Sequence, residues 1–319
     1  MKIYTNLDEV ALIKKPVLTI GTYDGVHLGH QKIINYLNLK AKQVGGESVV
    51  FTFHPHPRMV LHPNNHNLEL IQTIKERANK LEKAGVDHLI IFPFSIEFSK
   101  LTAVEFIRDI LVNKIGIHTL VVGYDHQFGR NREGTMQHLE KLAPIYNFEL
   151  EEISAFMKDE VKISSTKIRT ALQIGDIVET TKYLGNPFEL TGEVVKGDQI
   201  GNTIRFPTAN LKIVEDYKLI PCNGVYAVKV SIEGSEFSGM LNIGYRPTIT
   251  DKGDKRIEVN IFDFNQDIYG QTVTLKFVKL IRSEKTFANL DELKNQLTKD
   301  ENKCRVVLDN LSYTSNKKH

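Results

Sequence analysis

The stretch GTYDGVHLGHQKII, residues 21–34, determines how the first half of this chain is interpreted. It follows the apolar run VLTI at 17–20, and it places His27 and His30 in a glycine-rich turn before a helical pattern that begins near Gln31. A buried strand, a glycine turn and a helix in succession are typical of a parallel sheet covered by helices. By themselves, the two histidines are compatible with metal ligands, with phosphate contacts or with a polar turn.

Short apolar runs alternate with helical patterns through the rest of the first half. Strands are expected at 47–53, 88–94 and 119–125, and helices at 71–85 and 104–116. This alternation predicts an α/β domain with a parallel sheet and helices on both faces. Ligands bind such sheets at the carboxyl ends of the strands, which is where Gly21, His54 and Gly123 fall.

The second half has a different pattern, in which apolar and polar residues alternate at period two. This alternation is found at 224–232, 256–264 and 271–281. It is typical of antiparallel strands in a barrel or sandwich, and a closing helix is expected over 287–302. We place the boundary near Gly185–Pro187, which predicts domains at 1–185 and 186–319.

The bulk properties limit the classes of protein to consider. With 319 residues the chain is long enough for two domains, and its net charge of +2 argues against nucleic acid as a partner. The sequence has neither an apolar run of membrane-span length nor a secretory signal. Its two cysteines, Cys222 and Cys304, are far apart. We therefore expect a cytoplasmic protein without a membrane partner, either a monomer or a weak oligomer.

The context of His27 and His30 favours contacts with phosphate. The other histidines do not show the ligand spacing of a zinc site. A helix N-terminus offers free N–H groups and partial positive charge, and glycine lets the backbone approach a phosphate closely. A second set of donors stands at another expected helix start: Ser164, Ser165, Thr166, Lys167 and Arg169. This set is either a plain N-cap or a polyphosphate site.

Two loops that follow predicted strands carry aromatic residues. They are TFHPHPRMV at 52–60, with Phe53, and GYDHQFGRNREG at 123–134, with Phe128. One interpretation is a stiff proline loop and a solvated turn. The other is a slot for a flat ring, built from the two phenylalanines and the prolines.

The second half contains one polar group of similar interest. Thr208 and Asn210 in FPTANL are two residues apart, so their side chains point the same way in an extended chain. Two oxygen ligands on one side suit a magnesium ion that carries nucleotide phosphates, whereas the alternative is a solvated strand face. Glu258 is likewise either an exposed strand residue or a functional carboxylate.

Four segments of the first half, taken in order, resemble a known family. GTYDGVHLGHQ, TFHPHP, GYDHQFG and ISSTKIR are similar to the adenylyltransferase half of the bacterial bifunctional riboflavin kinase/FAD synthetases, which belong to the HxGH nucleotidyltransferases. The resemblance implies a Rossmann-like fold and the transfer of AMP from ATP to FMN, which yields FAD and pyrophosphate. The FMN phosphate is already anionic, so this reaction needs no protein nucleophile.

The resemblance also implies roles for individual residues. His27 and His30 would hold the ATP phosphates and stabilise charge at the reacting phosphorus. The residues implied for ATP are Gly21, Tyr23, Asp24, Gly29, Ser164, Ser165, Thr166 and Arg169. The residues implied for the flavin are Phe53, Pro55, His56, Pro57, Asp125, Phe128 and Arg130.

The second half resembles the riboflavin kinase domain, a six-stranded antiparallel barrel. The segments that carry this resemblance are TGEVVKGDQIGNTIRFPTANL, GVYAV, LNIGYRPT and RIEVNIFDFNQDIYGQ. It implies the phosphorylation of riboflavin by ATP, which yields FMN and ADP. Thr208 and Asn210 would coordinate Mg²⁺ with ATP, and Glu258 would be the general base on the ribityl hydroxyl.

One departure from the family pattern affects the kinase half. Asn202 stands where the family has arginine, and Arg205 stands where it has glycine. Three hypotheses follow: a bifunctional enzyme, an FAD synthetase with an inactive barrel, or a barrel that recruits a nucleic acid or protein while the first domain adenylylates another substrate.

Overall fold

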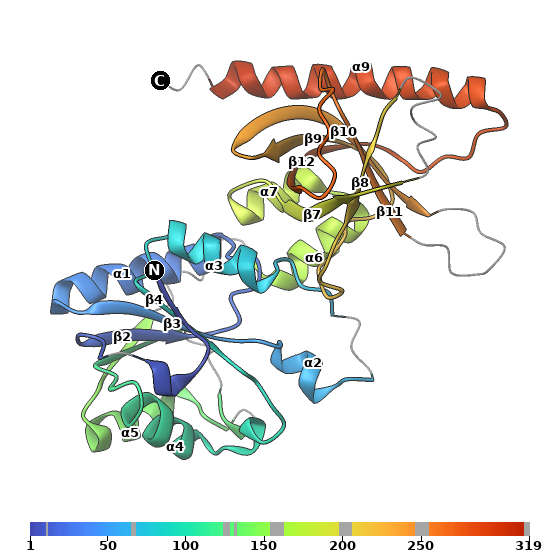
Figure 1. The fold of residues 1–319 in the computed structure, drawn as a ribbon. Coiled ribbons are helices and arrows are strands. Elements are labelled where there is room, and N and C mark those ends of the chain that lie inside the picture. Colours follow the sequence, from blue (N-terminus) through green and yellow to red (C-terminus); the bar gives the residue numbers. More distant parts are fainter. Residues whose placement is uncertain are drawn as a thin grey trace. The chain divides into compact units, whose positions relative to one another are not determined.

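The computed structural model describes residues 1–10, 12–64, 68–123, 128–130, 133–153, 163–197, 206–245 and 255–315. The chain divides into two compact units, residues 1–165 and 166–319 (Figure 1). Helix α7 (Ile177–Leu184) lies in the second unit. The domain boundary expected near Gly185–Pro187 stays a prediction.

A parallel sheet forms the centre of the first unit. Its strands are β1 (Lys2–Tyr4), β2 (Pro16–Ile20), β3 (Glu47–Phe53), β4 (His88–Phe92), β5 (Thr119–Gly123) and β6 (Glu149–Ile153). Among the described residues they form one six-stranded sheet in the order β1-β4-β3-β2-β5-β6, and every neighbouring pair is parallel. The strands expected from the sequence in this half are therefore confirmed.

Helices cover both faces of this sheet, as Figure 1 shows for α1 and α3 on one face and α4 and α5 on the other. The helical segments are α1 (Leu28–Val44), α2 (Pro57–Leu61), α3 (Ile74–Lys83), α4 (Ala103–Glu105), α5 (Met136–Tyr146), the 3₁₀ turns η1 (Leu7–Glu9) and η2 (Phe98–Lys100), and the π-helix η3 (Phe106–Val112). Successive side chains of β2 point to opposite faces of the sheet and pack in two separate hydrophobic cores. Val17 packs with α1 and α3, and Leu18 packs with η3 and α5. This is the doubly wound arrangement that the sequence predicts.

The order of the strands reverses direction at β2. The chain passes from β2 to β3 on one side and later returns to place β5 on the other side. In open parallel sheets, ligands bind outside the carboxyl ends of the strands at such a reversal. The loop that begins at Gly21 leaves β2 at this end.

The second unit is an antiparallel barrel between helices. Its strands are β7 (Glu189–Val195), β8 (Ala209–Lys212), β9 (Gly224–Ile232), β10 (Ser235–Tyr245), β11 (Lys255–Ile261) and β12 (Thr272–Ser283). They close in the order β10-β11-β8-β7-β12-β9, after α6 (Ser165–Ile174) and α7 and before α9 (Leu290–Ser315). Cys304 and Leu308 of α9 are fully buried with Ala227 and Met240 of the barrel. The expected barrel and closing helix are confirmed.

Candidate functional site

The turn between β2 and α1 has an unusual backbone. Tyr23, Gly25 and Val26 have φ angles of 49°, 95° and 40°. Glycine adopts such angles readily, but a β-branched valine is strained there. Strain of this kind persists only where the surroundings hold it, and it is concentrated at functional sites.

The two histidines of this turn form a stacked pair. His27 is the N-cap of α1, and its Nδ1 accepts a hydrogen bond from the His30 backbone N–H at 3.3 Å. The ring centroids lie 3.6 Å apart with an interplanar angle of 17°. A Cβ at Gly29 would lie 3.2 Å from the His27 ring, so this close approach favours glycine. The spacing of the two histidines thus serves a packed pair at a helix N-terminus.

Both histidines are neutral at pH 7. Burial lowers the pKa of His27 to about 4, against an opposing effect of the Asp24 carboxylate. Burial, the neighbouring His27 and the Arg77 cation hold the pKa of His30 well below its usual value. The Nδ1 atom of His30 is buried and has no hydrogen-bond partner among the described residues. The pair can therefore donate N–H groups to an anion without carrying charge of its own.

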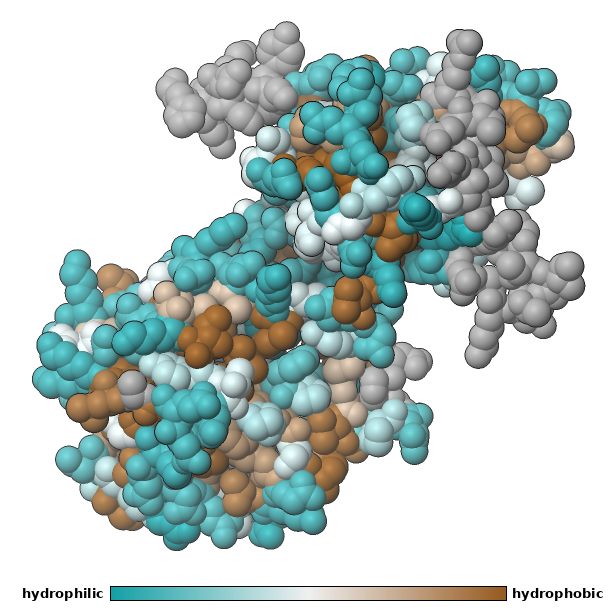
Figure 2. Space-filling model, in the orientation of Figure 1, coloured by the Kyte–Doolittle hydropathy of each residue, from teal (hydrophilic) through white to brown (hydrophobic). Residues whose placement is uncertain are grey.

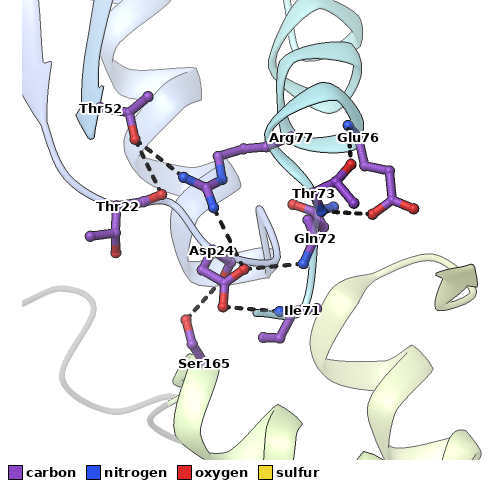
Figure 3. A network of polar contacts seen from close by, with 9 residues as sticks. All are labelled: Thr22, Asp24, Thr52, Ile71, Gln72, Thr73, Glu76, Arg77 and Ser165. Carbon is purple, nitrogen blue, oxygen red and sulfur yellow. Dashed lines mark hydrogen bonds and ion pairs between the residues drawn. The ribbon is translucent and has the colours of Figure 1, made fainter. Parts of the chain in front are cut away.

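Asp24 is directed into the protein and ties the turn to the segment before α3. Its side chain is fully buried, and its carboxylate oxygens accept from the N–H groups of Ile71 and Gln72 at 3.1 and 3.2 Å. An ion pair of 3.9 Å joins Asp24 to Arg77 of α3 (Figure 3). The Asp24 carbonyl accepts from the Ser165 hydroxyl at 2.8 Å. Sequence reasoning did not identify Arg77.

Gly21 and Tyr23 shape the same turn. The Tyr23 ring is buried, and its hydroxyl is 2.8 Å from the Thr19 hydroxyl inside the sheet. A Cβ at Gly21 would meet this ring at 2.9 Å. Burial raises the pKa of Tyr23, so its hydroxyl stays protonated. The structure thus gives both residues a packing role, and their expected contact with ATP stays a prediction.

The expected polyphosphate donors stand around the start of α6. Ser164 precedes the helix and Ser165 is its first residue, linked to Asp24 as described above. Thr166 and Arg169 continue the helix and belong to the second unit. A role in binding ATP phosphates stays a prediction for all four residues.

The residues expected to bind the flavin follow β3 and β5. Phe53 and Phe128 belong to one aromatic cluster, in which centroid distances of 5.7, 5.8 and 6.0 Å link Phe53, Phe98, Phe106 and Phe128 in turn. Their rings are therefore connected by packing, and a slot for a flat ring stays a prediction.

The other expected flavin residues lie in the loops beside this cluster. Pro55 follows β3, His56 caps α2 by accepting from the Arg58 N–H, and Pro57 is the first residue of α2. The Arg130 N–H donates to the Leu101 carbonyl at 2.8 Å. Asp125 lies outside the described residues, and flavin binding by this group stays a prediction.

In the barrel, the structure brings together two segments that are far apart in the sequence. Asn210 of β8 stands directly opposite Glu258 of β11 in the antiparallel register, and Thr208 immediately precedes β8. All three side chains are partly exposed. Glu258 forms an ion pair of 3.6 Å with Arg256.

Two cavities adjoin these residues, and Thr208 and Asn210 line both. The cavity of about 440 Å³ is bounded by the polar segment 264–269. The cavity of about 670 Å³ contains Glu258 and has an apolar wall that includes Val225, Met240 and Leu293. One cavity is thus more polar and the other has room for a flat apolar ring, and the two meet at Thr208 and Asn210.

No helix in the described parts of the chain is both long and apolar enough to cross a membrane. Figure 2 shows hydrophilic residues over much of the visible surface, with hydrophobic residues in smaller areas. These two observations agree with the ordinary composition of the chain.

The doubly wound unit with its histidine turn and the two-cavity barrel match two families of transferase domains. The FAD synthetase family model matches residues 11–167, and the riboflavin kinase family model matches residues 184–308. The chain belongs to the family of bifunctional riboflavin kinases/FMN adenylyltransferases, and it contains both enzyme domains.

Relatives with this description match nearly the whole chain. The protein of Bacillus subtilis is 37% identical over 93% of this chain and 94% of its own length. That of Listeria monocytogenes is 38% identical over 95% and 96%. That of Escherichia coli K12 is 37% identical over 89% and 90%. The hypothesis of an inactive barrel is not favoured, although Asn202 and Arg205 lie outside the described residues.

A solved structure is similar to this chain in fold. The crystal structure of a macrolide-efflux protein from Streptococcus pneumoniae, so described, is 35% identical and has a TM-score of 0.85. It covers 95% of this chain and 98% of its own. The fold is thus one that a relative adopts over its full length.

Proposed function

We propose that the first unit transfers AMP from ATP to FMN at the turn between β2 and α1. The neutral, stacked His27 and His30 at the N-terminus of α1 carry this proposal. Neutral imidazoles donate to phosphate oxygens, and the helix terminus adds N–H groups and partial positive charge. Their burial fixes them before the substrate arrives, which is how electrostatic stabilisation of a transition state is achieved.

The reaction needs positioning more than proton transfer. An oxygen of the FMN phosphate attacks the α-phosphorus of ATP, the bond from that phosphorus to the bridging oxygen breaks, and pyrophosphate leaves with the electron pair. Ser164, Ser165, Thr166 and Arg169 bind the leaving phosphates in this proposal. The aromatic cluster of Phe53 and Phe128 holds the flavin ring, with Pro55, His56, Pro57, Asp125 and Arg130 beside it.

We propose that the barrel phosphorylates riboflavin. The cavity with the apolar wall suits the flavin ring, and the cavity beside segment 264–269 suits the nucleotide. Glu258 lines the cavity with the apolar wall and lies opposite Asn210, close to where the two cavities meet. It takes the proton from the terminal ribityl hydroxyl as the oxygen attacks the γ-phosphorus and ADP leaves.

Thr208 and Asn210 fit a magnesium ion at the meeting point of the cavities. Hydroxyl and amide oxygens are hard ligands, and Mg²⁺ in nucleotide sites takes few protein ligands besides the phosphates. The described residues include no group of three or more histidines, cysteines and acids that could hold a metal. We propose the neutral pair of oxygens next to the nucleotide as the site. When bound, the ion neutralises charge on the transferred phosphate.

The deciding experiment supplies the pure protein with riboflavin, ATP and Mg²⁺ and separates the flavins by chromatography. A parallel reaction is fed FMN. FAD from both reactions supports both proposals. Formation of FAD from FMN but not from riboflavin would support the hypothesis of an inactive barrel. Asn202→Arg and Arg205→Gly, which restore the family pattern, would then be the variants to make. No FAD from FMN would refute the adenylyltransferase proposal. Flavin released on denaturation would argue against a barrel that recruits a macromolecule.

A further inference from the structure

Arg77 is a buried cation directly beneath the histidine turn. Its side chain is 1% exposed, although it projects from α3 and not from the turn. The Nη2 atom lies 3.9 Å from an Asp24 carboxylate oxygen, and Nη1 donates to the Thr52 hydroxyl at 3.5 Å. The Thr52 hydroxyl in turn donates to the Thr22 carbonyl at 3.3 Å. The guanidinium thus acts on the turn directly at Asp24, and at Thr22 through the Thr52 hydroxyl.

The geometry of α3 fixes this guanidinium. Thr73 and Glu76 form a reciprocal capping box at its N-terminus, with hydrogen bonds of 2.9 and 3.1 Å. The two residues before the cap donate their N–H groups to Asp24, as Figure 3 shows. The Asp24 carboxylate therefore receives donors from the backbone before α3 and faces the charge of Arg77 from within α3. Each of these contacts opposes relaxation of the strained backbone at Tyr23 and Val26.

Removing a cation from this place has two consequences. A buried carboxylate loses its charged partner, which is costly in a low-dielectric environment. The turn that carries His27 and His30 loses two of its anchors, and small displacements of catalytic groups slow reactions strongly. We propose that Arg77 is a positioning residue for adenylyl transfer: through Asp24 and Thr52 it holds the turn of residues 21–27 in the geometry that the two histidines require. This inference rests on the proposed function of the first unit.

Arg77 also contributes to the charge state of the pair. The groups that act on His30 are His27 of the turn and Arg77 of α3, while the Tyr23 ring contacts it edge-on at 5.0 Å. Asp24 acts on His27 in the opposite sense. Without the Arg77 charge the pKa of His30 rises, although burial still keeps it below its usual value. A protonated Nδ1 there would be a buried N–H without an acceptor.

The test compares Arg77→Met, Arg77→Lys and the exposed Lys83→Met of the same helix as a matched control. FAD formation from FMN is followed at saturating FMN and ATP between pH 5 and 8, with riboflavin phosphorylation as the control for enzyme concentration. We expect Arg77→Met to lower kcat by about 10²-fold. We also expect the fall of kcat on the acid side of its pH profile to move to higher pH. Arg77→Lys keeps the charge and the parent pH profile, with a smaller loss. Lys83→Met behaves as the parent.

Two results would overturn the inference. One is a kcat of Arg77→Met close to that of the parent. The other is a loss that equals the unfolded fraction in circular dichroism, with an unchanged pH profile. Should Arg77→Met not fold, Asp24→Asn/Arg77→Met removes both buried charges. Its kcat must then fall no further than that of Asp24→Asn alone, because the two residues act together, and a double variant clearly slower than Asp24→Asn would refute the coupling. A parent without FAD formation refutes the proposed function instead.

Discussion

The two sites of this chain hold their polar groups in opposite ways. In the first unit, His27 is 5% exposed and Asp24 is 0% exposed, and the turn between them is strained. In the barrel, Thr208, Asn210 and Glu258 are partly exposed beside two open cavities. The polar groups of the first proposed site are thus buried and held by the fold, whereas those of the second are in contact with solvent.

This difference in burial agrees with the different chemical requirements of the two reactions. Transfer of AMP to FMN starts from an anion, so it needs fixed donors and no base, and burial keeps the imidazoles neutral. Phosphorylation of riboflavin starts from a hydroxyl, so a carboxylate must accept a proton and later release it to water. A partly exposed Glu258 suits that exchange. The predictions below test whether the two sites are as independent as this contrast implies.

The largest effect is expected for Glu258→Gln. The amide keeps the shape of the side chain but cannot accept the hydroxyl proton, so FMN formation from riboflavin should fall by about 10²–10⁴-fold. FAD formation from FMN should stay at the parent rate, as chromatography of the flavins will show. Glu236→Gln, which alters an exposed acid of β10 paired with Lys276, is the control. A fall in both activities would contradict the separation of the sites.

The converse variant is His30→Ala. It removes a fixed donor, and we expect the rate of FAD formation from FMN to fall by about 10²–10³-fold. Riboflavin phosphorylation should be unaffected. His118→Ala is the matched control, because His118 precedes β5 at the opposite end of the sheet from the turn. Normal FAD formation by His30→Ala would refute the proposed role of the histidine pair in the reaction.

Acid should weaken the first unit through His27. Its pKa is about 4 in the folded protein and 6.5 in a model peptide, so the unfolded chain binds more protons between these values. Stability is therefore present above pH 6.5 and is lost as the pH falls toward 4, by at most about 3 kcal/mol. His27→Asn replaces the capping Nδ1 by a side-chain oxygen that does not titrate. Urea unfolding at pH 7 and pH 4.5 should show a smaller acid loss in the variant, and equal losses would argue against this account.

The smallest effect is expected for Gly197→Ala. An added Cβ would clash with the Asn210 amide nitrogen, so the amide must move. Overpacking of this kind costs about 1–3 kcal/mol, and we expect roughly tenfold slower riboflavin phosphorylation. FAD formation from FMN serves as the internal reference. Unchanged phosphorylation, together with a thermal midpoint like that of the parent, would mean that the position of Asn210 is unimportant.

Local patterns predicted much of this fold. The strand at 17–20, the glycine turn and the following helix were all expected in their order, because burial and turn chemistry are local properties. The helix begins at Leu28, earlier than expected near Gln31, because a histidine acts as its cap. The helix expected over 104–116 is instead a short α-helical turn followed by a π-helix at Phe106–Val112.

The parts of the sites that depend on distant segments could not be predicted. That Asn210 faces Glu258 is a matter of strand register between segments almost fifty residues apart. The sequence contains only a weak indication of Arg77. It lies on the buried face of α3 with Ala78 and Leu81, where apolar residues are usual. Only the structure shows that Asp24 faces this charge.

The edges of the two sheets have a consequence for the behaviour of the protein at high concentration. Among the described residues the barrel closes on itself and has no edge strand, whereas the parallel sheet ends in β1 and β6. β1 has only three residues, and β6 carries Glu149, Glu151 and Glu152. Two molecules that paired along β6 would place like charges opposite each other. A short β1 and a charged β6 thereby disfavour edge-to-edge aggregation of the sheet on which we propose the adenylylation site.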